Sequence, residues 1–215
     1  MIDFLTPIIS FFSIALANYQ QQSAIELIAV VLAVAYLVFA LRQSLWCWPC
    51  ALVSTALFTW VFFDVSLFME SLLNVYYMVM AVYGYWSWKY GGGHKNSLPI
   101  SRWKFNQHAI AISVITVCSL TSGYFLHHNT SAAWPYLDSF TTWASIVTTY
   151  MVARKIYENW YYWLVINSCA LFLYIDRELY ATALLMMIYL VLVIMGIVSW
   201  KRELNAQSNN VLLSH

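Results

Sequence analysis

The chain has 215 residues, of which 62% are hydrophobic, 18% aromatic and only 9% charged. Soluble domains carry about a quarter charged residues, and a soluble domain of this length could not bury so much apolar surface. These values exclude a soluble globular protein and indicate a lipid bilayer as the natural solvent. The formal net charge of +1 gives no reason to expect a nucleic-acid partner.

The first twenty residues, MIDFLTPIISFFSIALANYQ, begin with an acidic residue and lack the basic start of a cleavable signal peptide. We therefore expect no cleavable signal. The apolar run from Phe4 to Ala17 is short for a membrane crossing. We expect residues 1–21 to form an interfacial segment, with an extra crossing as the alternative.

Seven apolar runs follow, and each is long enough to cross the hydrocarbon layer as a helix. The predicted spans are residues 24–41, 44–63, 66–88, 105–126, 135–153, 158–175 and 179–200. Their joints are short, except for the polar segment 89–104. Nine of the ten Lys and Arg residues fall on one side of the bilayer, and only Arg177 falls on the other. The positive-inside rule then places the amino terminus outside and the carboxyl terminus in the cytoplasm.

The sequence also repeats itself, because residues 42–89 align without a gap with residues 154–201, at an offset of 112. The informative matches are an aspartate, a glycine and a tripeptide: Asp64 with Asp176, Gly84 with Gly196, and SWK at 87–89 with SWK at 199–201. Because the offset covers four helices, both repeats have the same orientation. Transporters built from such repeats bind substrate near the midplane, which favours transport over a duplication kept only for packing.

We therefore expect an all-α membrane protein with seven transmembrane helices. Two parallel three-helix repeats are joined by a linker helix, in a 3+1+3 arrangement. The expected organisation is an interfacial segment at 1–21, a first repeat at 22–88, a cytoplasmic loop and linker helix at 89–133, a second repeat at 134–200 and a cytoplasmic tail at 201–215.

Polar residues follow one face of the third predicted span, where Glu70, Asn74, Tyr77 and Gly84 recur at helical spacing. A polar group in lipid is costly, so this face is expected to meet protein or water. The second repeat keeps the tyrosine and the glycine but not the carboxylate or the carboxamide. Gly84 fits close helix packing. Asn74 is the better ligand candidate, whereas Glu70 fits a ligand contact or a structural hydrogen bond equally well.

The sixth predicted span carries Trp160, Trp163, Asn167 and Tyr174 on one face. An indole face suits a planar and especially a cationic ring, and a carboxamide both donates and accepts hydrogen bonds. The alternative for the two tryptophans is an aromatic belt at the membrane surface. Trp163 lies about 4.5 Å deeper than Trp160, which weakens that alternative.

The fifth predicted span has a stripe of Asp138, Thr142, Ser145 and Thr149. Each hydroxyl group either contacts a ligand or bonds to its own helix backbone. Asp138 lies near the outer end, where it either guides a cation, caps the helix or is solvated.

Motifs of enzyme chemistry are missing, and the five histidines have no metal-ligand spacing. We therefore expect no cofactor, no metal ion and no catalytic residue. The CWPC sequence at 47–50 has the spacing of a redox pair, but it begins an apolar run without a strand–helix context. Packing is thus favoured over redox chemistry for Cys47 and Cys50. A membrane enzyme or redox protein remains the alternative class.

Several stretches resemble the motifs of PnuC-type vitamin transporters, and the resemblance covers the chain from about residue 24. The WxxWxxxN pattern at Trp160, Trp163 and Asn167 is the most specific part. The other matching stretches are LYIDRELYA at 173–181, LLNVYYMVMAVYGYWSW at 72–88 and LDSFTTWASIVTTYMVARK at 137–155.

The resemblance implies a homotrimeric, SWEET-like transporter of nicotinamide riboside in the bacterial inner membrane. It implies facilitated diffusion, with a cytoplasmic kinase trapping the substrate by phosphorylation. It also implies that the WxxWxxxN residues bind the substrate, while Asn74 stands where relatives often have Gln. Thiamine and riboflavin carriers share this fold, so another vitamin or a sugar is the alternative substrate. Proton coupling through Glu70 or Asp138 is a further alternative.

Overall fold

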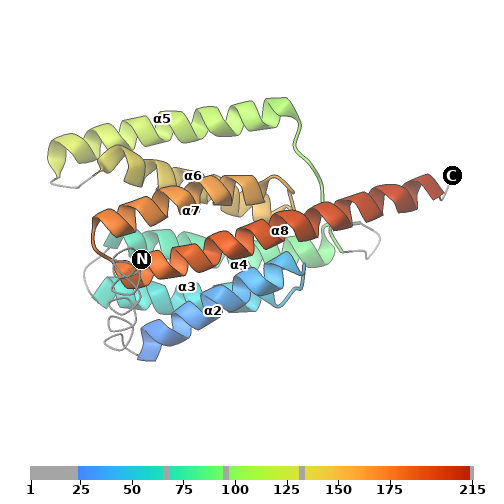
Figure 1. Ribbon diagram of the computed structural model, residues 1–215, viewed down its shortest axis with the longest axis horizontal. Helices are drawn as coiled ribbons and strands as arrows, with labels where there is room; N and C mark the ends of the chain where they lie inside the picture. Colours follow the sequence, from blue (N-terminus) through green and yellow to red (C-terminus); the bar gives the residue numbers. More distant parts are fainter. Residues whose placement is uncertain (1–23, 65–67, 94–96, 131–133, 214–215) are drawn as a thin grey trace, which may run out of the picture.

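The structure, a computed structural model, describes residues 24–64, 68–93, 97–130 and 134–213. The interfacial segment expected at 1–21 therefore lies outside the described residues. The helices of the described part are α2 (Ala24–Leu41), α3 (Cys47–Asp64), α4 (Phe68–Tyr90), α5 (Phe105–Asn129), α6 (Pro135–Ala153), α7 (Asn159–Asp176) and α8 (Tyr180–Leu213). They lie roughly side by side along one direction (Figure 1).

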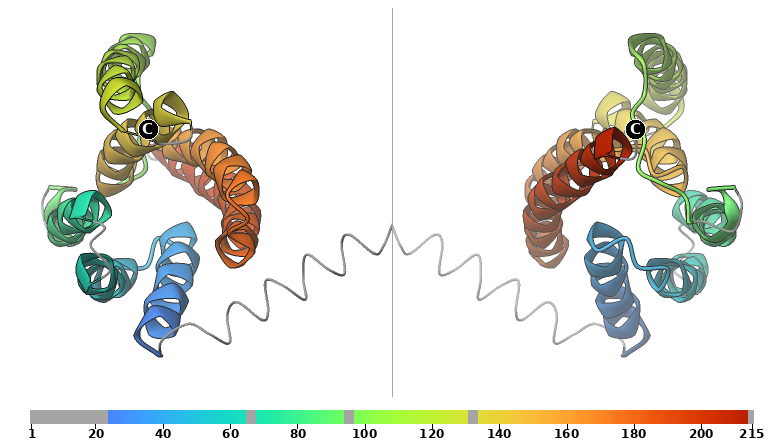
Figure 2. Two further views of the ribbon diagram at one scale, coloured as in Figure 1. Left: turned by 90° about the vertical axis from the view of Figure 1, so that its left-hand side faces the viewer. Right: turned by 90° about the vertical axis from the view of Figure 1, so that its right-hand side faces the viewer.

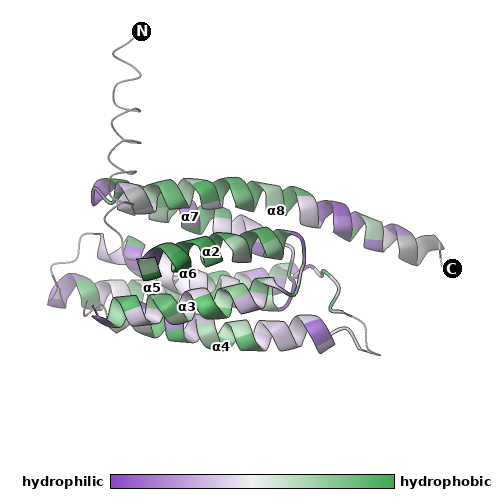
Figure 3. Cartoon of the chain, turned by 90° about the horizontal axis from the view of Figure 1, so that it is seen from below, coloured by the Kyte–Doolittle hydropathy of each residue, from purple (hydrophilic) through white to green (hydrophobic). Residues whose placement is uncertain are grey.

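The helix boundaries agree with the predicted spans to within a few residues, except at the carboxyl end. The last span was expected to end at residue 200, but α8 continues to Leu213. Residues 201–213, KRELNAQSNNVLL, contain neither Gly nor Pro, so nothing in their sequence stops the helix. This extension projects beyond the other helices (Figure 1) and is more hydrophilic than the part of α8 inside the bundle (Figure 3).

Helices α2, α4, α6 and α8 all run toward the same end of the bundle, on the right of Figure 1. We call it the basic end, because Arg42 and Arg154 follow α2 and α6 there and Lys89 lies in the last turn of α4. Lys201 lies on α8 at the start of its extension. Arg177 follows α7 at the opposite end. The charge asymmetry of the sequence is thus an asymmetry between the two ends of the bundle.

Consecutive helices pack in two series, α2–α3–α4 and α6–α7–α8, which we call the two halves. The halves meet where α2 packs on α8 and α4 packs on α6, while α5 lies at the edge against α6 (Figure 2). Because the offset of 112 residues maps α2 onto α6 and α4 onto α8, these two contacts are equivalent. The two contacts between the halves are therefore two copies of one interface.

The repeat extends to the turns and to individual side chains. Gln43 after α2 and Lys155 after α6 both have left-handed backbones, with φ values of 55° and 50°. Gly84 packs directly against the indole of Trp48, and Gly196 packs against Trp160, where an added Cβ would lie 2.6 Å from the ring. Helices approach this closely only because these positions lack a side chain.

Four helices in the described part are long and apolar enough to cross a membrane: Ala24–Leu41, Cys47–Asp64, Phe105–Asn129 and Thr182–Asn209. The chain is accordingly a multi-pass membrane protein, and large apolar side chains such as Val31, Trp60 and Ile110 face outward. The predicted spans that become α4, α6 and α7 are helices, but they are less apolar because they carry the polar stripes.

Candidate functional site

The WxxWxxxN stripe of α7 faces the inside of the protein and not its outer surface. Trp160 and Asn167 are 2% and 5% exposed. Trp163 is half-buried and packs against both hydrophobic clusters of the molecule. Neighbouring residues on the other side of the helix, such as Val165 and Phe172, are exposed. Two indoles and a carboxamide thus share a stripe because that stripe is the interior face of an apolar helix.

Two buried carboxamides, Asn74 and Asn167, have unused hydrogen-bonding capacity among the described residues. Asn74 Nδ2 donates to the backbone oxygen of Glu70, 2.9 Å away, and no hydrogen bond to the Asn74 carbonyl oxygen is found in the described part of the chain. The Asn167 side chain is buried, and no hydrogen bond to it is found within the described ranges. A buried carboxamide normally has partners, so Asn167 is suited to receive a polar ligand group.

The hydroxyl stripe of α6 is largely satisfied by its own helix. Thr142 Oγ1 donates to the backbone oxygen of Asp138 at 3.0 Å, and Thr149 Oγ1 donates to that of Ser145 at 2.8 Å. Ser145 differs, because its side chain lies close enough to the Tyr77 hydroxyl of α4 to influence it electrostatically. Of the hydroxyl groups in the predicted stripe, Ser145 is thus the one that reaches into the interface between the halves.

Tyrosines line the same interface. The Tyr76 hydroxyl donates to the backbone oxygen of Ile146, 2.9 Å away, and so joins α4 to α6. The Tyr36 hydroxyl has those of Tyr77 and Tyr189 as electrostatic neighbours. Of these four tyrosines, only Tyr77 was predicted from the sequence as a site residue. Tyr189 was detectable as the repeat counterpart of Tyr77, but Tyr36 carried no such signal.

The remaining predicted site residues gather at the end opposite the basic end. Arg177 pairs with Asp138, with 3.7 Å between Nη2 and Oδ2. Tyr174 lies beside Asp138, Arg177 and Glu70, and Glu70 itself is exposed. Asp138 is therefore an ion-paired residue near the mouth of the bundle, apart from Asn167.

Four tryptophans form a buried cluster at the basic end, which we call the tryptophan quartet. Trp48, Trp88, Trp200 and Trp160 are each at most 2% exposed. Their ring centroids form a chain with separations of 5.3, 6.0 and 5.4 Å in that order. Trp160, a predicted ligand residue, thus also belongs to the packing between the halves. From the sequence, Trp88 and Trp200 were known only as matching positions of the repeat.

The described ranges contain no group of three or more His, Cys, Asp or Glu side chains that could hold a metal ion. Cys47 and Cys50 are free thiols, and Cys47 is fully buried in the hydrophobic core.

Residues 23–202 match the model of the family described as nicotinamide mononucleotide transporter. The chain is 22% identical over 188 residues to the nicotinamide riboside transporter PnuC of Escherichia coli K12, covering 75% of this chain and 78% of that protein. It is 25% identical over 195 residues to the riboflavin/roseoflavin transporter RibM of Streptomyces davaonensis, covering 87% and 89%. The crystal structure of the vitamin B3 transporter PnuC aligns with a TM-score of 0.71 and 21% identity, over 92% of this chain and 90% of that one. This similarity shows a shared fold.

Proposed function

The chain belongs to the family of nicotinamide mononucleotide transporters, and we propose that it carries nicotinamide riboside across the membrane by facilitated diffusion. The observation that carries the choice of substrate is the interior WxxWxxxN stripe of α7. Trp163 offers an aromatic surface beside the buried Asn167 carboxamide, in a half of the protein that faces the other across a tyrosine-lined interface.

The chemistry of nicotinamide riboside matches these groups one by one. Its pyridinium ring is planar and cationic, and suits the indole faces of Trp160 and Trp163. Its carboxamide suits Asn167 or Asn74, which can donate and accept at once. Its ribose suits hydroxyl groups near Ser145. In this proposal the route to this position is lined by four of the remaining predicted site residues, Tyr77, Tyr174, Thr142 and Thr149. Glu70 and Asp138 stand at the end of the bundle opposite the basic end.

The proposal includes a seven-span topology in the bacterial inner membrane, with the basic end in the cytoplasm. The matching contacts of α2 with α8 and of α4 with α6 support two parallel repeats, with α5 as the linker of a 3+1+3, SWEET-like arrangement. Homotrimer formation is part of the proposal. Phosphorylation in the cytoplasm then traps the substrate, because a phosphate adds negative charge that an apolar, aromatic path does not solvate.

Riboflavin is the second candidate substrate, because the riboflavin/roseoflavin transporter RibM matches a larger share of this chain than E. coli PnuC does. Riboflavin also has a planar ring and hydroxyl groups, but it lacks the positive charge and the carboxamide. The two substrates therefore differ in what they need from Trp163 and Asn167.

Isothermal titration calorimetry of the purified full-length protein tests the substrate. Nicotinamide riboside, riboflavin, thiamine and glucose are titrated separately into the same preparation. We expect saturable binding of nicotinamide riboside and at least tenfold weaker binding of the other three compounds. Saturable binding of riboflavin without binding of the riboside would overturn the assignment.

A further inference from the structure

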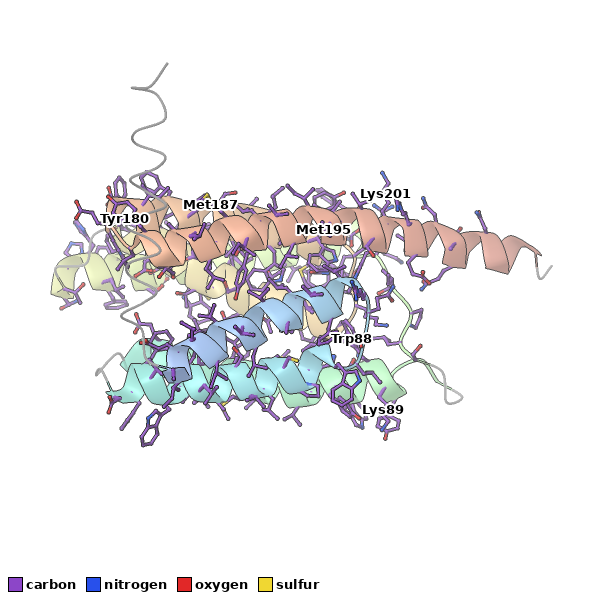
Figure 4. All side chains as sticks on the ribbon, turned by 60° about the horizontal axis from the view of Figure 1, so that its bottom comes forward. Trp88, Lys89, Tyr180, Met187, Met195 and Lys201 are labelled. Carbon is purple, nitrogen blue, oxygen red and sulfur yellow. The ribbon has the colours of Figure 1, made fainter. Side chains whose placement is uncertain are left out.

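Two equivalent hydrogen bonds tie the halves together at the basic end. Trp88 Nε1 of α4 donates to the backbone oxygen of Val152 in α6 at 2.9 Å. Trp200 Nε1 of α8 donates to the backbone oxygen of Ala40 in α2 at 3.1 Å. Donors and acceptors are both related by the offset of 112 residues, so this is one contact made twice. Figure 4 shows Trp88 on the side of α4 that faces α8, whereas Lys89 points away.

The tryptophan quartet fills the space between these two bonds. Trp88 and Trp200 meet at its centre with 6.0 Å between ring centroids, and Trp48 and Trp160 flank them. Since all four side chains are buried, the quartet closes this end of the interface between the halves. A solute that leaves the protein between the halves at the basic end must separate the rings.

A buried lysine adds a charge to this closure. Lys155 is 4% exposed, with its ammonium 4.6 Å from the centre of the Trp88 ring and 3.4 Å from Gln43 Oε1. Gln43 is its counterpart in the first half, so this contact also spans the interface. The ionisable groups near the ammonium are Cys47 and Glu203, and burial lowers the pKa of Lys155 to about 8.

Polar atoms without partners gather in the same cluster. Within the described ranges, the side-chain atoms that are individually sealed from solvent and lack a hydrogen bond are Trp48 Nε1, Ser87 Oγ, Asn159 Oδ1 and Trp160 Nε1. By contrast Ser199, the repeat counterpart of Ser87, donates to the backbone oxygen of Leu41 at 3.0 Å. A buried polar group without a partner is costly, and water reaching an opened cluster would remove that cost. A few hydrogen bonds therefore stabilise the closed cluster, and the buried polar atoms without partners destabilise it.

We propose that the tryptophan quartet and Lys155 form the gate at the basic end of the transport pathway, shut in this structure. The inference rests on the proposed transport function. Opening breaks the bonds that Trp88, Trp200 and Ser199 make to the other half. It also separates the rings and hydrates Lys155 together with the four unsatisfied atoms.

Cys47 is a native reporter for this opening, because its thiol is fully buried and lies in the same core cluster as the quartet. The triple variant C50A/C118A/C169A leaves it as the single cysteine of the full-length protein. The rate at which N-ethylmaleimide modifies Cys47 in detergent then follows the population of the open gate. The measurement needs no substrate.

The serine pair provides matched variants that remove one hydroxyl group each. Ser199→Ala loses a bond across the interface and should raise the modification rate about fivefold, the effect of one net hydrogen bond. Ser87→Ala loses an unsatisfied group and should leave the rate unchanged or lower it. Trp200→Phe should raise the rate by at least as much as Ser199→Ala. Trp86→Phe, at a 58% exposed site on α4, should not change it.

Equal rates for Ser199→Ala and Ser87→Ala would overturn the gate, whatever the substrate is. If Trp200→Phe does not yield monodisperse protein, the comparison of Ser199→Ala with Ser87→Ala still tests the gate. If the expected pattern holds while nicotinamide riboside does not bind, the gate stands and the substrate assignment fails. If the riboside binds and the pattern is missing, the substrate stands and the gate is rejected.

Discussion

Under the proposed function, Asn167 is the side chain on which recognition of the carboxamide should depend most. Replacing it with leucine keeps the branched shape of the side chain and removes a buried polar group that has no partner in the described part of the chain, so the fold should persist. The ligand would lose its hydrogen bonds while its own amide remains buried. We expect Asn167→Leu to weaken nicotinamide riboside binding by about 10- to 100-fold in calorimetry.

Ser168→Ala is the control for this variant, since the neighbouring serine is exposed and bonds only to its own helix, at the Leu164 oxygen. It should bind the riboside like the parent protein. Unchanged affinity of Asn167→Leu, in a protein that elutes as the parent does, would remove Asn167 from the site. Asn74→Leu, in the other half, should show a smaller loss if it makes a secondary contact.

Lys155 predicts a pH dependence of stability. Burial lowers the pKa of this lysine from 10.5 to about 8, so between those values the unfolded chain binds more protons than the folded one. The contribution of Lys155 to the free energy of unfolding is therefore lowest below about pH 8, and it rises as the pH increases toward 10.5. We expect the Tm difference between the parent and Lys155→Met to shift in favour of the parent from pH 7.5 to pH 10.

The matched control is Lys201→Met, because Lys201 is exposed on α8. Its Tm difference from the parent should stay nearly constant over the same pH range. A parallel pH profile for Lys155→Met and the parent would show that the ammonium is solvated and does not belong to the closed cluster.

At the residue scale, helical spacing correctly predicted which side chains of α7 face inward. It could not predict that Trp88 and Trp200 donate to backbone oxygens of the other half, because a backbone carbonyl leaves no mark in the sequence. Tyr36 was missed for a related reason. It lies in a uniformly apolar helix, and its repeat counterpart, Thr148, bonds to its own backbone at Ala144.

The packing of α7 on α8 depends on a glycine under an indole. A methyl group at Gly196 would lie 2.6 Å from the Trp160 ring, well inside van der Waals contact. Overpacking of this kind costs about 1–3 kcal/mol. We expect Gly196→Ala to lower the Tm of the detergent-solubilised protein by several degrees, measured by a thermal shift of intrinsic fluorescence.

A second substitution tests whether the indole is the cause. Gly196→Ala combined with Trp160→Phe should lose less stability than the sum of the two single changes, because the smaller ring makes room for the methyl group. Met195→Leu, on the outward face of α8, serves as a neutral control. If the two losses of stability add strictly, the contact between Gly196 and Trp160 does not limit the packing.

The helices themselves were predictable because apolar runs and polar joints alternate along the chain. Helices α2 and α6 begin and end at the predicted residues. The end of α8 was predicted at residue 200 because hydropathy falls there, but hydropathy marks the edge of the lipid and not the end of the helix. Residues 201–213 continue the helix because they contain neither Gly nor Pro, and most of residues 201–207 have high helix propensity.

At the scale of the whole molecule, the repeat explains why the halves meet as they do. The same tryptophan bond, the same glycine under an indole and the same left-handed turn occur once in each half. The differences are as informative. Asn167 aligns with Thr55, whose hydroxyl bonds to its own helix at Ala51. A ligand between the halves therefore meets two related but chemically unequal walls.

The positions of the carboxylates bear on whether a proton gradient or the membrane potential drives transport. The buried polar side chains of the described part are Ser, Thr, Asn and Lys, and none is an aspartate or glutamate. Glu70 is exposed, and Asp138 is paired with Arg177 near the end of the bundle. Proton coupling through a carboxylate needs that carboxylate within the pathway, and neither of these two is placed to serve. A cationic substrate that moves alone should instead follow the membrane potential.

Uptake of radiolabelled nicotinamide riboside into proteoliposomes separates these two driving forces. A charge crossing 100 mV gains about 2.3 kcal/mol, so an inside-negative potential of that size should concentrate the riboside about 50-fold at equilibrium. A pH gradient imposed at zero potential should leave the final level unchanged. Accumulation that follows the pH gradient would require a proton-carrying residue and would reject simple diffusion. Protein-free liposomes of the same lipid provide the background, because leakage and adsorption are the same while the carrier is missing.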